Sequence, residues 1–185
     1  MIMVAQENTK TIDVHLNSLH KNGRPAITPE IGSFYAQAAA VCFESQQHTT
    51  GTKMLIDGEF DKIFLVSWDN ITEQMRKGFA DMQEATEYGA YGIAVLIIEN
   101  LTPLTVVQRS YKGPGFDFWL GEKNDDELFQ GKKRLEVSGI LKGDERTIDY
   151  RIKSKLKQTE RSDGVLPAYA IVVEFSMPRS RIVGK

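Results

Sequence analysis

Short apolar runs rich in Val, Ile and Phe recur along the chain, and Gly, Pro or Asp residues bound them. Runs of this kind are typical of β-strands that end at turns. They predict strands at residues 52–57, 62–68, 104–109, 116–120, 134–140 and 168–175. The segment DGEFD carries turn-forming residues between the first and second of these runs, and SYKGPG carries them between the third and fourth. We therefore expect a turn within the first pair of strands and a hairpin from the second.

Three other segments place apolar residues three or four positions apart, which is the spacing of one helix face. They predict helices at residues 29–47, 72–100 and 145–160. The first begins at Thr28, a suitable N-cap, followed by Pro29 at the first helical position. The second contains three glycines, which favours two helices or one kinked helix, and its apolar part at 92–98 is also compatible with a strand. Helices and strands alternate in this way in an α/β protein.

The net charge, the cysteine count and the lengths of the apolar runs exclude several classes of protein. The chain has 185 residues and a net charge of −2, so no global basic surface marks it as a nucleic-acid binder. Cys42 is the single cysteine, which excludes an internal disulfide and cysteine-rich zinc motifs. Neither a signal-peptide pattern nor an apolar run of spanning length occurs. We expect a cytoplasmic protein that does not enter a membrane.

Two predicted strands each carry one acidic residue among apolar neighbours. Asp117 lies in GPGFDFWL and Glu136 lies in RLEVSG. A charged side chain on a buried strand costs several kcal/mol unless a cation, a metal or hydrogen bonds compensate it. Two such carboxylates on successive strands suggest one shared explanation, and a divalent metal is the sharpest.

The helices next to these strands carry further candidates. Glu87 begins a face of small apolar residues and Tyr91 in the second helix, and Glu84, one turn earlier, is an alternative to it. In the third helix three polar residues flank the apolar stripe at i, i+4 and i+7, namely Arg151, Lys155 and Gln158. These residues flank the buried face of the helix rather than oppose it.

From Glu87 onward the predicted order is helix, strand, strand, strand, helix, strand. With its acids on the first helix and on the second and third strands, this order resembles the PD-(D/E)XK, or restriction-endonuclease-like, nuclease superfamily. The resemblance implies an α/β fold with a mixed sheet flanked by helices and an αβββαβ core. We expect a nuclease-like core at residues 71–178, an N-terminal α-β-β extension at 1–70 packed on it, and a tail at 179–185. The sequence leaves the role of the extension open: it could extend the sheet, mediate homodimer formation or dock a partner.

The resemblance also implies a site. Asp117 and Glu136 would hold Mg²⁺ or Mn²⁺ together with the backbone carbonyl of Val137, and Glu87 would bind the metal directly or through water. Lys155 would orient the attacking water or stabilise developing charge. A phosphate-positioning role falls to Gln158 and Arg151, and Lys112 is a further substrate-binding candidate.

One position departs from the family pattern. The superfamily has a lysine two residues after the strand glutamate, and this chain has Ser138 there. Some members carry the lysine, or a glutamine, on the following helix instead. Lys155 and Gln158 match that arrangement.

Three interpretations follow. The first is a metal-dependent phosphodiesterase acting on DNA, in its sharpest form a Mg²⁺-dependent endonuclease. The second is a non-catalytic protein of the same fold that serves as a binding or structural partner, which Ser138 favours. The third is an ordinary α/β domain with internal ion pairs, Asp117 with Arg151 and Glu136 with Lys155. The nuclease interpretation requires both carboxylates and Lys155 to converge in an open cleft, whereas dry ion pairs without a cleft would contradict it.

Overall fold

The structure is a computed structural model and describes residues 10–111, 113, 115–123, 133–160 and 166–185. Its elements in chain order are β1 (Thr11–His15), the 3₁₀ helix η1 (Leu16–His20), α1 (Pro29–Ser45), β2 (Thr52–Gly58), β3 (Lys62–Ser67), α2 (Glu73–Gly78), α3 (Met82–Leu101), β4 (Leu104–Arg109), β5 (Phe118–Glu122), β6 (Lys133–Ile140), α4 (Glu145–Thr159), β7 (Ala168–Glu174) and β8 (Arg179–Gly184). The predicted α/β class is confirmed.

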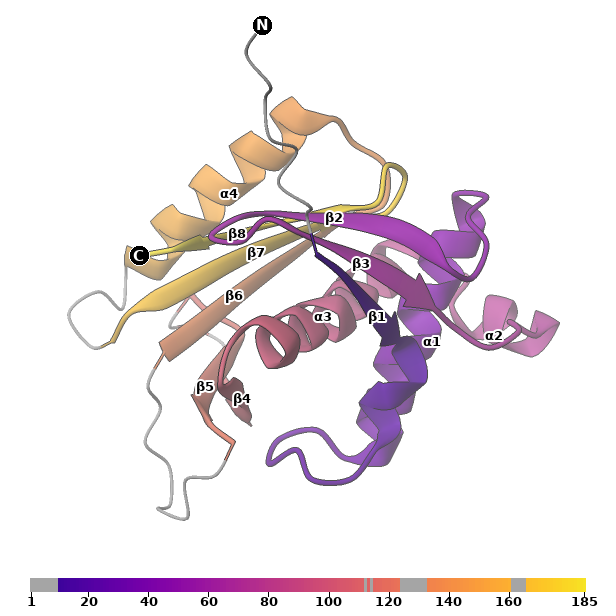
Figure 1. The fold of residues 1–185 in the computed structure, drawn as a ribbon, viewed down its shortest axis with the longest axis horizontal. Helices are drawn as coiled ribbons and strands as arrows, with labels where there is room; N and C mark the ends of the chain where they lie inside the picture. Colours follow the sequence, from indigo (N-terminus) through magenta and orange to yellow (C-terminus); the bar gives the residue numbers. More distant parts are fainter. Residues whose placement is uncertain (1–9, 112, 114, 124–132, 161–165) are drawn as a thin grey trace, which may run out of the picture.

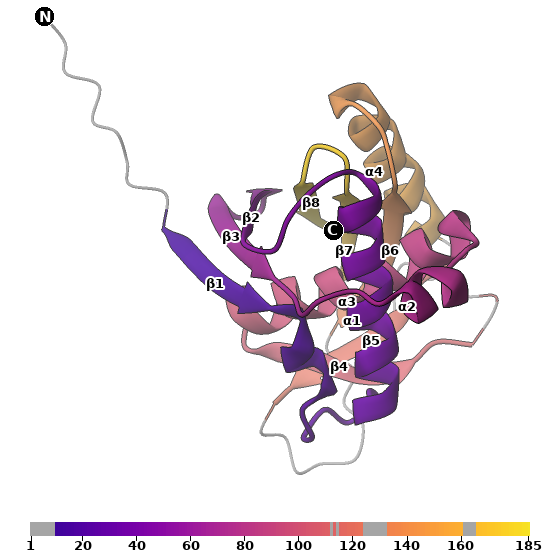
Figure 2. The same ribbon diagram turned by 90° about the vertical axis from the view of Figure 1, so that its right-hand side faces the viewer.

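In the part of the chain that the structure describes, eight strands form one sheet in the order β1-β3-β2-β8-β7-β6-β5-β4. The sheet is mixed, because β1–β3, β2–β8 and β6–β7 pair in parallel and the other neighbours pair in antiparallel fashion. Figure 1 shows α1 and α3 below this sheet and α4 above it, and Figure 2 shows the same layers from the side. The central strand β7 is covered on both faces, and each of its residues is buried.

Two apolar cores lie on the two faces of the sheet. The larger core joins α1 and α3 to one face of β7 through Ile171 and Val173. The smaller core lies under α4, where Ile148 and Ile152 pack on Val172. Because neighbouring residues of a strand point to opposite faces, β7 serves both cores and fixes how α3 and α4 lie relative to each other.

The segment predicted as one interrupted helix forms two helices, as one alternative allowed. α2 ends at Gly78, and Asp81 then caps α3 by accepting hydrogen bonds from the backbone N–H groups of Gln83 and Glu84. Residues 92–98 lie inside α3 and are buried, so the strand alternative for them is wrong. They have no polar side because α3 lies between α1 and the sheet.

The C-terminal residues differ from the prediction. Residues 179–184 form β8, which pairs with β2 and β7, so the expectation of a tail there is wrong. Ser180 and Ile182 are fully buried, while Arg181 pairs with Asp57 of β2. β1 was not predicted either, because its short segment has little apolar patterning. The added strands place the N-terminal region and the segment from α3 onward in one continuous sheet.

From Met82 the chain runs α3, β4, β5, β6, α4, β7, which is the predicted order. The second of these strands begins at Phe118 instead of residue 116, so Asp117 stands immediately before β5. Within the described residues, no helix combines the length and the apolar character needed to cross a membrane.

Candidate functional site

The two predicted acids lie on neighbouring backbone segments. The Asp117 backbone N–H donates to the Leu135 carbonyl at 2.8 Å, and its own carbonyl accepts from the Ser110 N–H at 2.8 Å. Asp117 therefore continues the hydrogen bonding of β5 between β4 and β6, although it precedes the strand. This holds its side chain next to β6, where Glu136 lies.

The loop before Asp117 packs closely on the end of α4. Gly115 has a φ of +81°, and a Cβ atom there would lie 2.4 Å from the Gln158 carbonyl oxygen. Only glycine permits both this backbone conformation and this approach. Gly115 therefore allows the chain before Asp117 to lie against α4 as well as against β6.

Strand β6 faces α4 with alternate residues. Glu136 accepts a hydrogen bond from Lys155 Nζ at 2.6 Å, and Ser138 accepts one from Arg151 at 3.2 Å. Ile140 continues the same face into the small core under α4. Arg151 and Lys155, which lie one turn apart on α4, thus contact Ser138 and Glu136, which lie on the same face of β6. The helical spacing of Lys155 and Arg151 correctly predicted that they flank the buried face of α4.

The Asp117 side chain is 17% exposed, and both of its carboxylate oxygens contact neighbouring residues. Its Oδ2 accepts from the Val137 N–H at 2.8 Å, and its Oδ1 lies 3.0 Å from the Tyr91 hydroxyl. Arg109 forms an ion pair with it at 3.5 Å. The same tyrosine hydroxyl lies 3.0 Å from Glu87 Oε1. One hydroxyl proton can be donated to only one of these carboxylates at a time.

The Glu136 side chain is 7% exposed and forms a direct ion pair with Lys155. Burial raises the pKa of its carboxyl to about 7, and the nearby negative charge of Asp117 adds to this rise. Lys155 opposes the shift through its hydrogen bond and its charge. Arg109 pairs with Asp117 and Lys155 with Glu136, but the raised pKa indicates that burial outweighs the nearby cations at Glu136. Additional positive charge would stabilise its ionised form.

Val137 adds a neutral oxygen to this surface. Its N–H donates to Asp117, and in an antiparallel ladder the N–H and C=O of one residue point to the same side of the strand. The last β5–β6 pair on this side is Phe118 with Leu135, so β5 does not pair with Val137. The Val137 carbonyl therefore points to the same side of β6 as Asp117, at a position where β5 no longer pairs with β6. Asp117, Glu136 and this carbonyl are a suitable oxygen donor set for Mg²⁺ or Mn²⁺.

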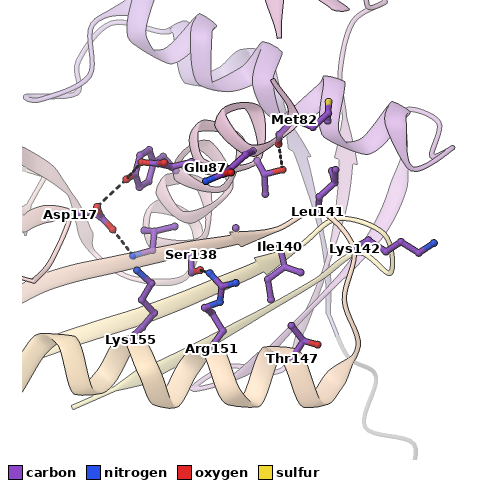
Figure 3. A pocket seen from close by; sticks show the side chains of 15 residues that line it. Met82, Glu87, Asp117, Ser138, Ile140, Leu141, Lys142, Thr147, Arg151 and Lys155 are labelled. Atoms are coloured by element: carbon purple, nitrogen blue, oxygen red, sulfur yellow. Dashed lines mark hydrogen bonds between the residues drawn. The ribbon is translucent and has the colours of Figure 1, made fainter. Parts of the chain in front are cut away.

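Two cavities meet at Asp117 and Lys155. The larger, of about 800 Å³, runs between α3 and α4, and the smaller, of about 320 Å³, runs toward the loop after β4. Figure 3 shows Lys155, Arg151 and Thr147 in sequence along α4 on one side of the larger cavity. We call the two cavities together the candidate active-site groove. The charged residues thus meet in an open groove, as the nuclease interpretation requires.

The groove brings together most of the predicted site residues, which are Glu87, Asp117, Glu136, Val137, Arg151, Lys155 and Gln158. Of the two alternatives on this helix, Glu87 lines the groove and Glu84 does not. Lys112 lies outside the described residues. Of the two ion pairs expected for an ordinary domain, Glu136 with Lys155 is present. Asp117 pairs instead with Arg109, and Arg151 reaches Ser138.

Sequence reasoning did not assign Tyr91 and Arg109 to the site. Arg109 donates to the Tyr91 hydroxyl at 2.9 Å, and its guanidinium carbon lies 4.4 Å from the centre of the Tyr91 ring. The position of Tyr91 one turn after Glu87 was the available signal. Arg109 gave none, because the end of a predicted strand does not reveal which helix it faces.

The site offers few side chains that could bind a metal. Among the described residues, no set of three or more His, Cys, Asp or Glu side chains is placed to hold a metal. A bound Mg²⁺ would therefore keep several water ligands, as this ion commonly does. Comparison with known proteins gives no assignment: no family model, no curated protein and no solved structure matches the chain.

Proposed function

We propose that the protein is a metal-dependent phosphodiesterase that acts on DNA and has a core of the PD-(D/E)XK type. The observation that carries this proposal is the meeting of Asp117, Glu136 and Lys155 inside the candidate active-site groove. The element order from α3 to β7 and the adjacent strands β7-β6-β5-β4 support the proposed core. A homodimer and a cytoplasmic location remain predictions.

Asp117, Glu136 and the Val137 carbonyl would hold the metal, and Glu87 would bind it directly or through water. When bound, a divalent metal lowers the pKa of a coordinated water and stabilises charge on a phosphate. Tyr91 and Arg109 hold Asp117 in place by contacts to its Oδ1 atom. These contacts fix the carboxylate toward the groove before substrate arrives.

Lys155 is the proposed replacement for the strand lysine of the superfamily. Its ammonium group reaches Glu136 from α4, and its side chain is 19% exposed, so it can also contact a phosphate in the groove. There it would orient the attacking water or stabilise developing negative charge. Arg151 brings a guanidinium group to Ser138, where the family pattern has its lysine. Gln158 lines the smaller cavity and would position a phosphate.

A non-catalytic protein of the same fold is the second candidate. The direct contact of 2.6 Å between Lys155 and Glu136 favours it, since this pair compensates part of the buried charge without a metal. Ser138 favours it as well. In that case the groove would bind a partner without hydrolysing it.

Cleavage of labelled DNA oligonucleotides with Mn²⁺ or Mg²⁺ distinguishes the candidates. We expect metal-dependent cleavage by the wild type and a loss of at least about 100-fold in Asp117→Asn, which removes one proposed metal ligand. The matched control is Asp61→Asn, because Asp61 is exposed in the turn between β2 and β3. Equal activity of wild type and Asp117→Asn, or no cleavage by the wild type, would contradict the proposal.

A further inference from the structure

The proposed catalytic residues lie between the two ends of the candidate active-site groove. Gln158 lies in its smaller cavity, while Thr147 lies in the larger cavity on the other side of Lys155. At 1.5 Å per helical residue, these two positions on α4 are about 16 Å apart. This length corresponds to roughly five stacked nucleotides at 3.4 Å each. A substrate that fills the groove therefore continues past the cleavage site in both directions.

Among the described residues, exposed side chains lie at both ends of the groove. The larger cavity ends beside the exposed Lys142, and the smaller one ends beside Tyr111, whose side chain is 77% exposed. A cavity closed at one end would hold a strand terminus and favour removal of terminal nucleotides. This groove has no such stop among the described residues.

The acids lie at the floor of the groove. Glu136 is buried on β6 and lines the smaller cavity, while the larger cavity, which reaches Asp117, is bounded by α3 on one side and α4 on the other. A phosphate in the larger cavity must pass between these two helices to reach Asp117. A B-form duplex is stiff over a groove of this length, with a persistence length of about 50 nm, and keeps its bases paired inside. An unpaired strand is flexible enough to follow the floor of the groove and can present its bases to the groove walls.

The groove also offers contacts that suit unpaired bases. Tyr111 presents an exposed ring at one end, next to Arg109, and Arg151 and Lys142 supply positive charge toward the other end. Aromatic rings together with a cationic track are the usual means of binding single strands without sequence preference.

We propose that the candidate active-site groove binds an unpaired DNA strand along its whole length and that cleavage occurs at internal phosphodiester bonds. This inference rests on the proposed function. In the reaction, a water oxygen forms a bond to phosphorus and one of the two bonds between phosphorus and a sugar oxygen breaks. The water loses a proton and the leaving sugar oxygen gains one, so water is the sole co-reactant.

The test compares three substrates of one sequence with Mn²⁺: a linear single strand, a covalently closed single-stranded circle, and a linear duplex. We expect the circle and the linear strand to be cut at rates within about threefold, and the duplex at least tenfold more slowly. Shortening of the linear strand with an intact circle would overturn internal cleavage. Equal rates on duplex and single strand would overturn the preference for unpaired DNA. No cleavage of any substrate would contradict the proposed function itself, and this inference with it.

A binding measurement tests the role of Tyr111 separately. Fluorescence anisotropy of a labelled single strand in EDTA should show at least fivefold weaker binding by Tyr111→Ala than by the wild type, because a stacking contact is lost. The matched control is Tyr150→Ala, because Tyr150 is 74% exposed on α4 but lines neither cavity. Equal affinities of the two variants would overturn the proposed path of the strand.

Discussion

At the scale of single residues, the site depends on charges that meet from different elements. Asp117 and Glu136 were predicted from the sequence because each stands among apolar neighbours, where an uncompensated charge is costly. Lys155 was predicted because helical spacing places it beside the buried face of α4. The contact of Asp117 with Arg109 was not predicted, since it depends on how β4 and α3 pack. Residue patterns thus identified the charged groups but not all of their partners.

The Lys155→Met substitution tests the most consequential of these contacts. It leaves the nearly buried Glu136 carboxylate without its ammonium partner, which should lower the free energy of unfolding by about 1–3 kcal/mol. It should also lower the rate of DNA cleavage by about 100-fold or more, since a positioned cation is lost. Urea denaturation and the cleavage assay measure the two effects.

Lys153→Met is the matched control, because Lys153 is exposed on the same helix. We expect this control to change neither stability nor cleavage appreciably. Wild-type cleavage by Lys155→Met would contradict the assigned role of Lys155.

At the scale of elements, periodicity predicted most strands and the helices α1 and α4 close to their observed bounds, and it predicted the end of α3 but not its start at Met82. β8 was missed because alternate arginines make residues 179–184 look like a polar tail, although Ser180 and Ile182 are buried between β2 and β7. Its arginines are compensated by Asp57 and by acids of α4, which no local pattern reveals. Elements with strong internal patterns were predictable, and those that depend on distant partners were not.

The approach of β6 to α3 is a testable feature at this scale. A Cβ atom at Gly139 would lie 2.4 Å from the Thr86 carbonyl oxygen, so Gly139→Ala must push α3 away from the sheet. We expect a loss of about 1–3 kcal/mol in the free energy of unfolding, as for other overpacked sites. Reduced cleavage should accompany it, because α3 carries Glu87 and Tyr91.

Gly78→Ala is the control for this substitution, because a Cβ atom there meets nothing within 4 Å. Alanine at the end of α2 should leave stability unchanged or raise it by less than about 1 kcal/mol. Equal stability of the two variants in thermal or urea denaturation would show that β6 and α3 do not approach this closely.

At the scale of the whole molecule, the N-terminal region is part of the same sheet as the proposed nuclease core. β2 pairs with β8, α1 packs on α3, and Phe43 of α1 lies 5.0 Å from Phe175 between ring centres. The sequence suggested an extension packed on a core. It did not reveal the continuous sheet, because the strand that joins the two was not predicted.

The two tryptophans report on the two parts of this sheet. Trp68 follows β3, and Trp119 lies in β5. In Trp68→Phe and in Trp119→Phe, we expect the remaining fluorescence and the far-UV circular dichroism to change at the same urea concentration, since the two parts share one sheet and one core. Separate midpoints in either variant would contradict cooperative unfolding.

The central claim is that Asp117 and Glu136 form a divalent-metal site, and calorimetric titration with Mn²⁺ tests it most directly. We predict binding by the wild type and by the Asp61→Asn control. We predict affinity at least tenfold lower in Asp117→Asn and in Glu136→Gln, with circular dichroism showing that both variants are folded. An absence of Mn²⁺ binding by the wild type, or equal affinity in all four proteins, would contradict the account.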